Sequence, residues 1–593
     1  MPNQPLKDRI VDRLLPQVQM PGQYIGGEWN SVRKSDQDVR GKLCLAFPDA
    51  YSIGMSYHGL QVLYALMNAR ADWACQRAFT PLSDMEELLR KEQLPLFSLE
   101  DFTPLSEFDV LGFSLQYDLG YTNVLTMLDL GGIPLAAEGR TLEHPLVIVG
   151  GPCAANPEPM ARFIDLFLLG DGEEALPAVC DLWLELKRSG RDREAMLAEM
   201  TARLPYVYVP RFYQPQYDAD GRAAAVRPLR DDVPQTITPA VVADIEAVPL
   251  PVKPVVPYVE CVQDRITLEI MRGCPWRCRF CQGTTLKRPV RYRKVETILA
   301  AALESYRNTG YNEISLLGLS TSDYPQIDEL LRRLHETFQP LGVSVSLPSL
   351  RINQQWRSLG DLLNTDRRDG LTIAPEAARD EMRAQIGKRI TNDDLYEGCR
   401  RAMENGFTRI KLYFMCGLPG ECQADLDGII DMAENVSRLG LEILGRPATV
   451  TANVSNFVPK PQTAYQWNAM QRREYFDEAH ERLRRRKRMR SVQLRLHDVD
   501  SSLLEGVLCR GDRRLGPAIE LAWRRGARFD AWQERFRCHV WWQALADSGI
   551  DVETLIHRPY PLGTPLPWQH IAIRQGQAYL EQEQRRSQEH AQL

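Results

Sequence analysis

The chain has 593 residues, of which 44% are hydrophobic and 25% are charged, and its formal net charge is −6. These values are typical of a globular protein with several domains, and they exclude a disordered chain or a uniformly basic nucleic-acid-binding protein. No stretch approaches the roughly 18 consecutive apolar residues of a membrane span, and residues 1–17 lack the apolar core of a signal peptide. We therefore expect a cytoplasmic protein with no membrane segment.

The first third of the chain predicts an α/β domain. Residues 1–40 are a lead-in with a short amphipathic helix, and residues 41–185 alternate buried strands with helices. The predicted strands are "KLCLAF", "DVLGFSL", "LVIVGG" and "LFLLG". Continuous apolar strands that alternate with helices are typical of a parallel sheet covered on both faces. We predict a doubly wound, Rossmann-like domain whose ligand lies beyond the carboxyl ends of its strands.

The remaining chain predicts a linker, a barrel and a helical end. Residues 186–260 are rich in proline and contain a hairpin-like "DADG" at 218–221, so they form a linker. Residues 261–468 contain six strand-like stretches separated by helices, which favours a partial TIM barrel. Residues 469–593 are mixed and mainly helical.

Three cysteines lie close together at the start of the predicted barrel. Cys274, Cys278 and Cys281 have the spacing C-x3-C-x2-C and directly follow a strand-like "ITLEI". A cytosolic cysteine group of this kind indicates a metal site. Three thiolates favour a soft metal or an iron–sulfur cluster, whereas structural zinc needs a fourth ligand, which the motif lacks. A zinc knuckle with a remote fourth ligand is the alternative.

With Phe280 before the last cysteine, this motif resembles the signature of the radical S-adenosylmethionine (SAM) superfamily. The resemblance implies a [4Fe–4S] cluster held by the three cysteines, with one open iron that binds SAM. It further implies reductive cleavage of SAM to a 5′-deoxyadenosyl radical, and an electron donor such as flavodoxin or ferredoxin.

Later strand ends are similar to the SAM-binding motifs of the same superfamily. These positions are Gly318 and Ser320 in "LLGLSTSDY", Ser349 and Arg351 in "SLPSLRI", Glu376 in "TIAPEA" and Gly417 in "FMCGLPGE". The resemblance implies that they contact SAM. Glycine and proline also end strands for purely structural reasons, so the set is more informative than any single member.

The N-terminal domain resembles the cobalamin-binding domains that precede some radical barrels. "VIVGGPCAANPEP" and "FLLGDGEEA" place Gly150, Gly151 and Gly170 at strand ends, where glycine lets a flat macrocycle approach the backbone. The structural alternative is that these glycines only make tight turns. Over about residues 40–570 the chain resembles an uncharacterised family that joins a B12-binding-like domain to a radical barrel.

One feature departs from that pattern. The Asp-x-His-x-x-Gly signature that supplies a histidine to cobalt is absent, because Ser56 and Gln61 flank His58 where Asp and Gly are needed. We expect His58 to be a partly buried residue in a loop or at a helix start. Cobalamin is then bound without a protein histidine, or the domain keeps the fold without the cofactor.

The sequence as a whole predicts a radical SAM enzyme that carries out cobalamin-dependent methyl transfer to an unknown substrate. A cobalamin-free modification of RNA or protein, such as methylthiolation, is the first alternative. A non-catalytic iron–sulfur binding or assembly protein is the second. The basic run "RLRRRKRMR" at 482–490 keeps RNA open as a partner, but we favour a solvated helix face.

Overall fold

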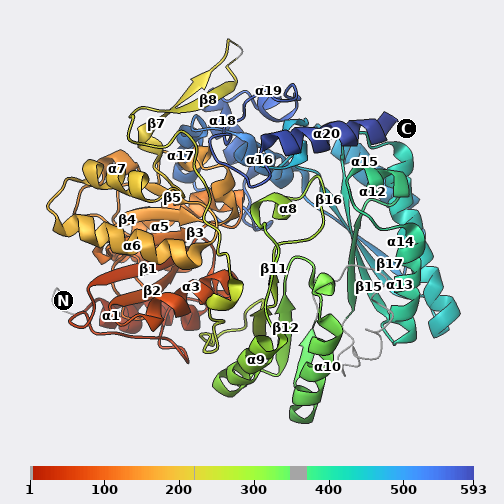
Figure 1. Cartoon of the computed structure of the whole chain (residues 1–593), viewed down its shortest axis with the longest axis horizontal. Helices are drawn as coiled ribbons and strands as arrows, with labels where there is room; N and C mark the ends of the chain where they lie inside the picture. The colour runs from red at the N-terminus through yellow and green to blue at the C-terminus, as the bar shows by residue number, and fades with distance from the viewer. Residues whose placement is uncertain (1–4, 220, 347–369, 593) are drawn as a thin grey trace.

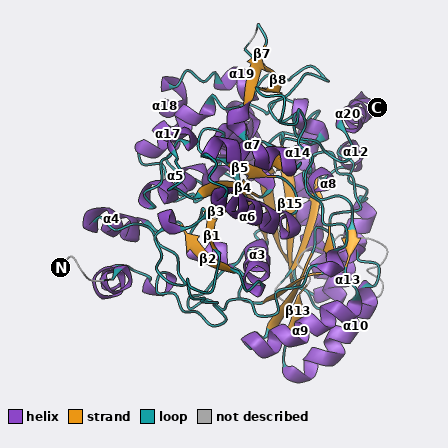
Figure 2. Ribbon diagram, turned by 60° about the vertical axis from the view of Figure 1, so that its left-hand side comes forward, coloured by secondary structure: helices purple, strands orange, loops and turns teal. Residues whose placement is uncertain are grey.

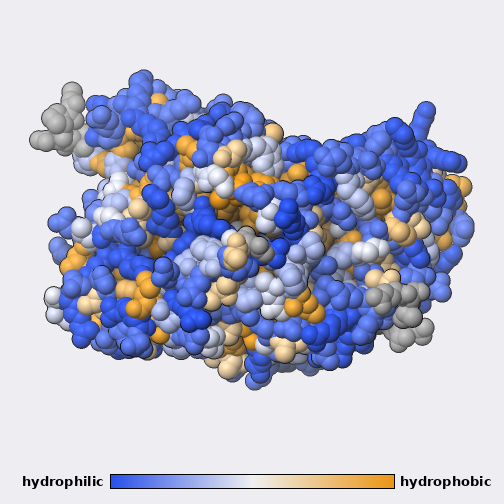
Figure 3. All heavy atoms as spheres, turned by 90° about the horizontal axis from the view of Figure 1, so that it is seen from above, coloured by the Kyte–Doolittle hydropathy of each residue, from blue (hydrophilic) through white to orange (hydrophobic). Residues whose placement is uncertain are grey.

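The computed structural model describes residues 5–219, 221–346 and 370–592. An N-terminal α/β domain lies beside the barrel region, and the C-terminal helices run along the top of both (Figure 1). No helix in the described part of the chain is long and apolar enough to cross a membrane. The face seen from above is mainly hydrophilic, with apolar side chains gathered near its middle (Figure 3).

The N-terminal domain is built on one six-stranded sheet of order β2-β1-β3-β4-β5-β6, in which only β6 runs antiparallel to its neighbour. Its strands are β1 (Gly41–Phe47), β2 (Trp73–Phe79), β3 (Val110–Ser114), β4 (Leu146–Gly150), β5 (Leu166–Leu168) and β6 (Val207–Tyr208). Helices α3 (His58–Ala69) and α6 (Gly172–Arg188) contact each other, and so do α4 (Ser83–Glu92) and α5 (Tyr121–Leu130) (Figure 2). The predicted doubly wound fold is confirmed.

Strand β2 was not predicted, because "WACQRAF" carries Gln76 and Arg77 in its middle. The structure buries Arg77 completely and pairs it with Glu28 at 3.0 Å and Glu100 at 2.7 Å. A buried charge is tolerated when it is paired and hydrogen-bonded, so partners far away in sequence make this strand possible.

The barrel region contains two parallel sheets, of order β13-β12-β9 and β14-β15-β16-β17. Their strands are β9 (Ile266–Glu269), β12 (Glu313–Leu317), β13 (Ser344–Ser346), β14 (Leu371–Glu376), β15 (Arg409–Cys416), β16 (Thr449–Asn456) and β17 (Val492–Leu496). Helices α9 (Val295–Thr309), α10 (Ile327–Phe338), α13 (Asn392–Glu404) and α14 (Gln423–Leu444) connect or cover them. The six predicted strands are present, and β17 extends the sheet beyond residue 468.

The C-terminal region joins the other two. Its helices are α15 (Arg473–Arg486), α16 (Val499–Arg510), α17 (Leu515–Arg524), α18 (Cys538–Asp547), α19 (Val552–Ile556) and α20 (Gln577–Gln592). Helix α17 packs on α5 of the first domain, while α20 packs on α12 (Asp380–Gln385) of the barrel region. In the linker, β7 (Tyr213–Tyr217) and β8 (Ala223–Pro228) form the antiparallel hairpin that the turn sequence predicts.

Candidate cofactor site between the two strand-end edges

The three cysteines lie in the loop after β9 and the short strand β10 (Met271–Arg272). Cys278 is buried, and Cys274 and Cys281 are half-buried. Burial raises the pKa of the Cys281 thiol to about 11, and the neighbouring Cys278 and Cys274 thiols raise it further. The three thiols are therefore close enough that each thiolate disfavours the next. A bound cationic centre removes that repulsion, so the donor set fits an iron–sulfur cluster better than it fits three free thiols.

No group of three or more His, Cys, Asp or Glu residues within the described ranges is arranged to hold a metal ion as the side chains stand. The fit of the cysteines to a cluster therefore rests on their chemistry and proximity.

Contacts from distant parts of the chain fix the cysteine loop. The Arg279 guanidinium pairs with Glu583 of α20 at 3.1 Å and donates to the Gln385 carbonyl at 2.6 Å. The Arg279 backbone N–H donates to the Ile386 carbonyl at 2.9 Å. Both charged side chains are more than nine-tenths buried, so this ion pair ties the loop to the C-terminal helix.

Phe280, predicted to lie at the cofactor site, is partly buried against a small apolar cluster below the loop. The cluster contains Ala377, Met382, Ile386, Leu418, Phe457 and Tyr465. These residues follow β14, β15 and β16, so Phe280 anchors the cysteine loop to three other strand ends.

Gly318 and Ser320, the predictions at the second strand end, lie beside the same loop. A Cβ on Gly318 would lie 2.9 Å from Met271 Cγ, so glycine lets the Met271 side chain pack closely against this strand end. Ser320 Oγ donates to Asp323, whose carboxylate also accepts from the Trp276 indole of the cysteine loop. The loop and this strand end are therefore linked through Asp323.

Glu376 and Gly417 end β14 and β15. Glu376 has φ +68°, a left-handed conformation that non-glycine residues rarely adopt, and it pairs with Lys388 at 3.1 Å. Gly417 has φ +85°, and its N–H donates to the Glu421 carboxylate at 2.9 Å. Ser349 and Arg351 lie outside the described residues.

Close backbone packing requires glycine at two of the three predicted positions in the N-terminal domain, but not at the third. A Cβ on Gly151 would lie 2.5 Å from the Leu115 carbonyl oxygen, and one on Gly170 would lie 2.1 Å from the Ala240 carbonyl oxygen. Their close backbone contacts explain both, together with positive φ values. At Gly150 a Cβ would meet nothing closer than 3.8 Å, so packing does not demand glycine there.

A cavity of about 370 Å³ separates the carboxyl ends of the N-terminal strands from those of the barrel. All three glycines line it, and so do Met271, Gly273 and Gly318 beside the cysteine loop. The apolar lining consists of Leu45, Val62, Leu63, Phe113, Ile148, Leu168, Leu176, Leu317 and Leu319. A second cavity of about 270 Å³ shares Gly151, Gly170, Asp171 and Lys287 with the first. Together they fall within the size range of cofactor sites.

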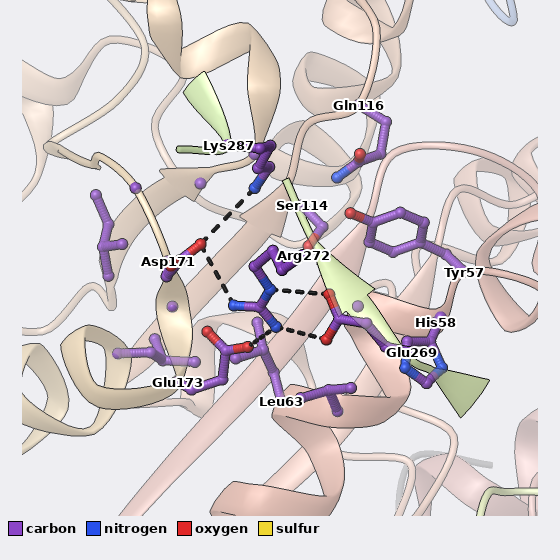
Figure 4. Close-up of a pocket in the computed structure, with 18 of the residues that line it drawn as sticks. Tyr57, His58, Leu63, Ser114, Gln116, Asp171, Glu173, Glu269, Arg272 and Lys287 are labelled. Atoms are coloured by element: carbon purple, nitrogen blue, oxygen red, sulfur yellow. Dashed lines mark hydrogen bonds and ion pairs between the residues drawn. The ribbon is translucent and has the colours of Figure 1, made fainter. Parts of the chain in front are cut away.

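Arg272, which the sequence did not identify as a site residue, joins the two strand-end edges that face the cavity, one from the N-terminal domain and one from the barrel (Figure 4). Its guanidinium is bidentate to Glu269 at 2.8 Å and also pairs with Glu173 and Asp171 of the N-terminal domain. Arg291 pairs with the second Asp171 oxygen at 2.6 Å. Because Arg272 lies two residues before Cys274, the network connects the glycine-rich loop directly to the cysteine loop.

His58 begins α3 and lines the cavity, in agreement with the expected helix start. Its Nε2 is buried without a hydrogen-bond partner, and burial lowers its pKa to about 4. The imidazole is therefore neutral at pH 7.

Two arginines of the basic run pair with acidic residues of α14. Arg482 pairs with Asp427 at 2.7 Å, and Arg486 pairs with Asp431 at 2.7 Å. These partners lie about 55 residues away in sequence and were not foreseen. The pairs favour a solvated helix face over an RNA-binding surface.

Two family models match the chain. The model described as "Radical SAM proteins, N-terminal" matches residues 59–210, and the one described as "Radical SAM superfamily" matches residues 268–433. The second match contains the three cysteines and four of the predicted strand ends.

Curated relatives and solved structures show more distant similarity. "Uncharacterized protein MJ0966" from Methanocaldococcus jannaschii is 25% identical over 432 residues, which cover 72% of this chain and 83% of the relative. The ribosomal protein uS12 methylthiotransferase RimO from Microcystis aeruginosa is 26% identical over 178 residues, which cover 28% of this chain and only 40% of the relative. The radical SAM methyltransferase TsrM from Kitasatospora setae, solved with cobalamin and a [4Fe–4S] cluster, is 14% identical at a TM-score of 0.45, with 70% of this chain and 74% of that chain covered.

Proposed function

Since this chain belongs to the radical SAM superfamily, whose members use a [4Fe–4S] cluster and SAM, we propose that Cys274, Cys278 and Cys281 hold the cluster and that cobalamin occupies the cavity between the two edges. The reaction is methyl transfer to a substrate at the barrel mouth. When bound, the cluster supplies the electron that cleaves SAM, and cobalamin supplies the methyl group.

One observation carries this proposal: a single cavity is bounded by the cysteine-loop edge of the barrel and by the strand ends of the doubly wound domain. Open α/β sheets bind ligands beyond the carboxyl ends of their strands, and barrels carry their chemistry at the same ends. Here the two edges face each other, so a ligand of the first domain lies against the cluster loop of the second.

The cavity lining also fits a large, mostly apolar ligand. Gly150 leaves space that any side chain would fill, and the walls are chiefly leucine, valine and isoleucine. A corrin with its nucleotide tail is larger than the first cavity alone, so the proposal requires that it extend into the second. Neutral His58 adds no charge to the wall.

The residues of the chain orient and shield the site. Phe280 of the cysteine loop, together with Gly318, Ser320, Glu376 and Gly417 at the strand ends of the barrel, are the proposed SAM contacts. The C-terminal helix α20 covers the loop from the other side through Glu583. An acidic one-electron carrier such as flavodoxin or ferredoxin is the proposed electron donor.

The experiment compares wild type with Gly150→Leu after anaerobic reconstitution with iron, sulfide and hydroxocobalamin. The Cβ of a leucine at this position would meet nothing closer than 3.8 Å, and the side chain would occupy the cavity, so the variant should keep its iron and lose bound cobalamin. Gly139→Leu is the matched control, because Gly139 has an ordinary φ and lies outside the cavity. Gly190 would be unsuitable, because its φ of +75° would strain any side chain. Equal cobalamin uptake by Gly150→Leu and wild type would contradict the proposal.

The product pattern tests the reaction class. The proposal predicts that wild type with cobalamin and a reductant converts SAM to both 5′-deoxyadenosine and S-adenosylhomocysteine. If 5′-deoxyadenosine forms while no cobalamin is retained, the cobalamin-free modification of RNA or protein becomes the better account.

A further inference from the structure

A separate cavity of about 330 Å³ lies between the β7–β8 hairpin and the C-terminal region. Its walls come from the turn of the β7–β8 hairpin, the end of α16, the start of α17 and the loop that enters α19, which meet at the top of the molecule in Figure 1. It shares no lining residue with the cavity between the two edges. Three of its lining residues are arginines: Arg222, Arg510 and Arg514.

Arg510 is a fully buried cation with no acidic partner among the described residues. Its Nε and Nη1 donate only to backbone carbonyls, those of Leu555, Gln466 and Asn468. Its Nη2 is buried and makes no hydrogen bond. A buried charge that is neither paired with an acidic group nor fully hydrogen-bonded is costly, so an anion bound beside this guanidinium would stabilise it.

The two carboxylates that line the cavity are already engaged. Asp512 accepts from Arg514 at 2.6 Å and 2.9 Å, which neutralises that arginine. Asp551 caps α19 by accepting from the N–H and hydroxyl of Thr554. Neither carboxylate is within salt-bridge distance of Arg510.

An aromatic ring and a helix start complete the cavity. The Tyr560 ring lies 4.9 Å from the Arg510 guanidinium and 5.8 Å from that of Arg222, so it holds both arginines on one aromatic support. Helix α17 begins at the cavity with no acidic residue in its first turn, and its positive dipole end favours an anion.

We propose that this cavity binds the phosphate group of a small molecule between Arg222, Arg510 and the start of α17. A tetrahedral anion offers oxygens to donors that converge from several directions, which a planar carboxylate does less well. Arg510 also holds the carbonyls of residues 466 and 468, in the segment that follows β16, so binding stabilises the junction of the barrel with its C-terminal region. This site does not depend on the identity of the cofactor in the other cavity.

The test is calorimetric titration of the full-length chain with inorganic phosphate, pyrophosphate and adenosine monophosphate, with sodium acetate as the carboxylate probe. Replacing Arg510 would break the bonds that hold residues 466–468, so Arg222→Glu at the cavity rim is the main variant. Arg227→Glu is its matched control, because it makes the same charge change on an exposed residue of the same hairpin outside the cavity.

We expect wild type to bind a phosphate-bearing probe in preference to acetate, and Arg222→Glu to bind it about tenfold or more weakly. Arg227→Glu should stay within about threefold of wild type, because screening reduces long-range effects. Tighter binding of adenosine monophosphate than of inorganic phosphate would indicate an organic phosphate as the ligand, and the reverse would indicate the free ion. No binding of any phosphate probe, or equal losses in both variants, would overturn the proposal.

Discussion

The two edges that face each other across the central cavity are built in opposite ways. The barrel edge carries reactive and charged groups that are held by contacts from distant regions, such as Arg279 with Glu583. The N-terminal edge offers mainly glycines and apolar side chains to the cavity, and its two carboxylates, Asp171 and Glu173, are paired with Arg272 of the barrel edge. The barrel edge depends on reactive and charged side chains, whereas the N-terminal edge depends on the shape of the cavity wall. A substitution at the barrel edge should therefore remove a cluster ligand, and one at the N-terminal edge should remove space for cobalamin.

The largest effect is expected at the barrel edge. Cys278→Ala should abolish the visible absorbance of the reconstituted iron–sulfur cluster, because two thiolates remain where three are needed. Cys399→Ala changes a buried cysteine of α13 and should keep the absorbance. A variant Cys278→Ala that retains full absorbance would show that the cluster assignment is wrong.

The second-largest effect is expected for Arg272, which connects the two edges. Arg272→Met leaves the carboxylates of Glu269, Glu173 and Asp171 without their shared partner, which should lower the free energy of unfolding by about 3–5 kcal/mol. Arg265→Met breaks a more exposed pair with Glu313 and should cost about 1 kcal/mol or less. Chemical denaturation measures both values, and equal losses would show that the Arg272 network does not join the domains.

The C-terminal helix should have a smaller effect that is specific to the cluster loop. Glu583→Gln removes the buried partner of Arg279 and should cost about 1–3 kcal/mol. If Glu583 positions the loop, the variant should also lose its cluster absorbance faster in the presence of a chelator. Glu581→Gln changes a more exposed pair on the same helix and should match wild type. Unchanged cluster lifetime in Glu583→Gln would restrict Glu583 to a general stabilising role.

The last expected effect is a change in the pH dependence of stability. Burial raises the pKa of the Glu421 carboxyl to about 7 from an ordinary value of 4.5. The folded state therefore keeps a proton that the unfolded state releases between these pH values, so this group's contribution to stability falls as pH rises from about 4.5 to 7.

Glu421→Gln removes that contribution, up to about 3 kcal/mol over the window. The variant should lose less stability than wild type between pH 5 and pH 8, as measured by thermal unfolding at each pH. Parallel curves of stability against pH for the two proteins would contradict the raised pKa of Glu421.

Local sequence patterns predicted the features whose residues lie close together in the sequence. The cysteine spacing, the apolar strands and the strand-end glycines are all read within a few residues, and in the structure Gly150, Gly151, Gly170 and Gly318 line one cavity. Arg272, Asp171 and Lys287 were missed because the ion pairs that join the two domains connect residues 99 or more positions apart in the chain. Strand β2 was missed for the same reason, since Arg77 is made compatible with burial by Glu28 and Glu100. The local signals for Arg272 were its position directly before the cysteine loop and the presence of Glu269 three residues earlier.

The most direct test of the account is metal analysis of the wild-type chain after anaerobic reconstitution with iron, sulfide and hydroxocobalamin and removal of unbound material. If the cavity between the two edges is a cobalamin site beside the cluster, each chain should retain about four irons and about one cobalt. Four irons with no cobalt would contradict the account and leave the N-terminal edge as a substrate or scaffold surface.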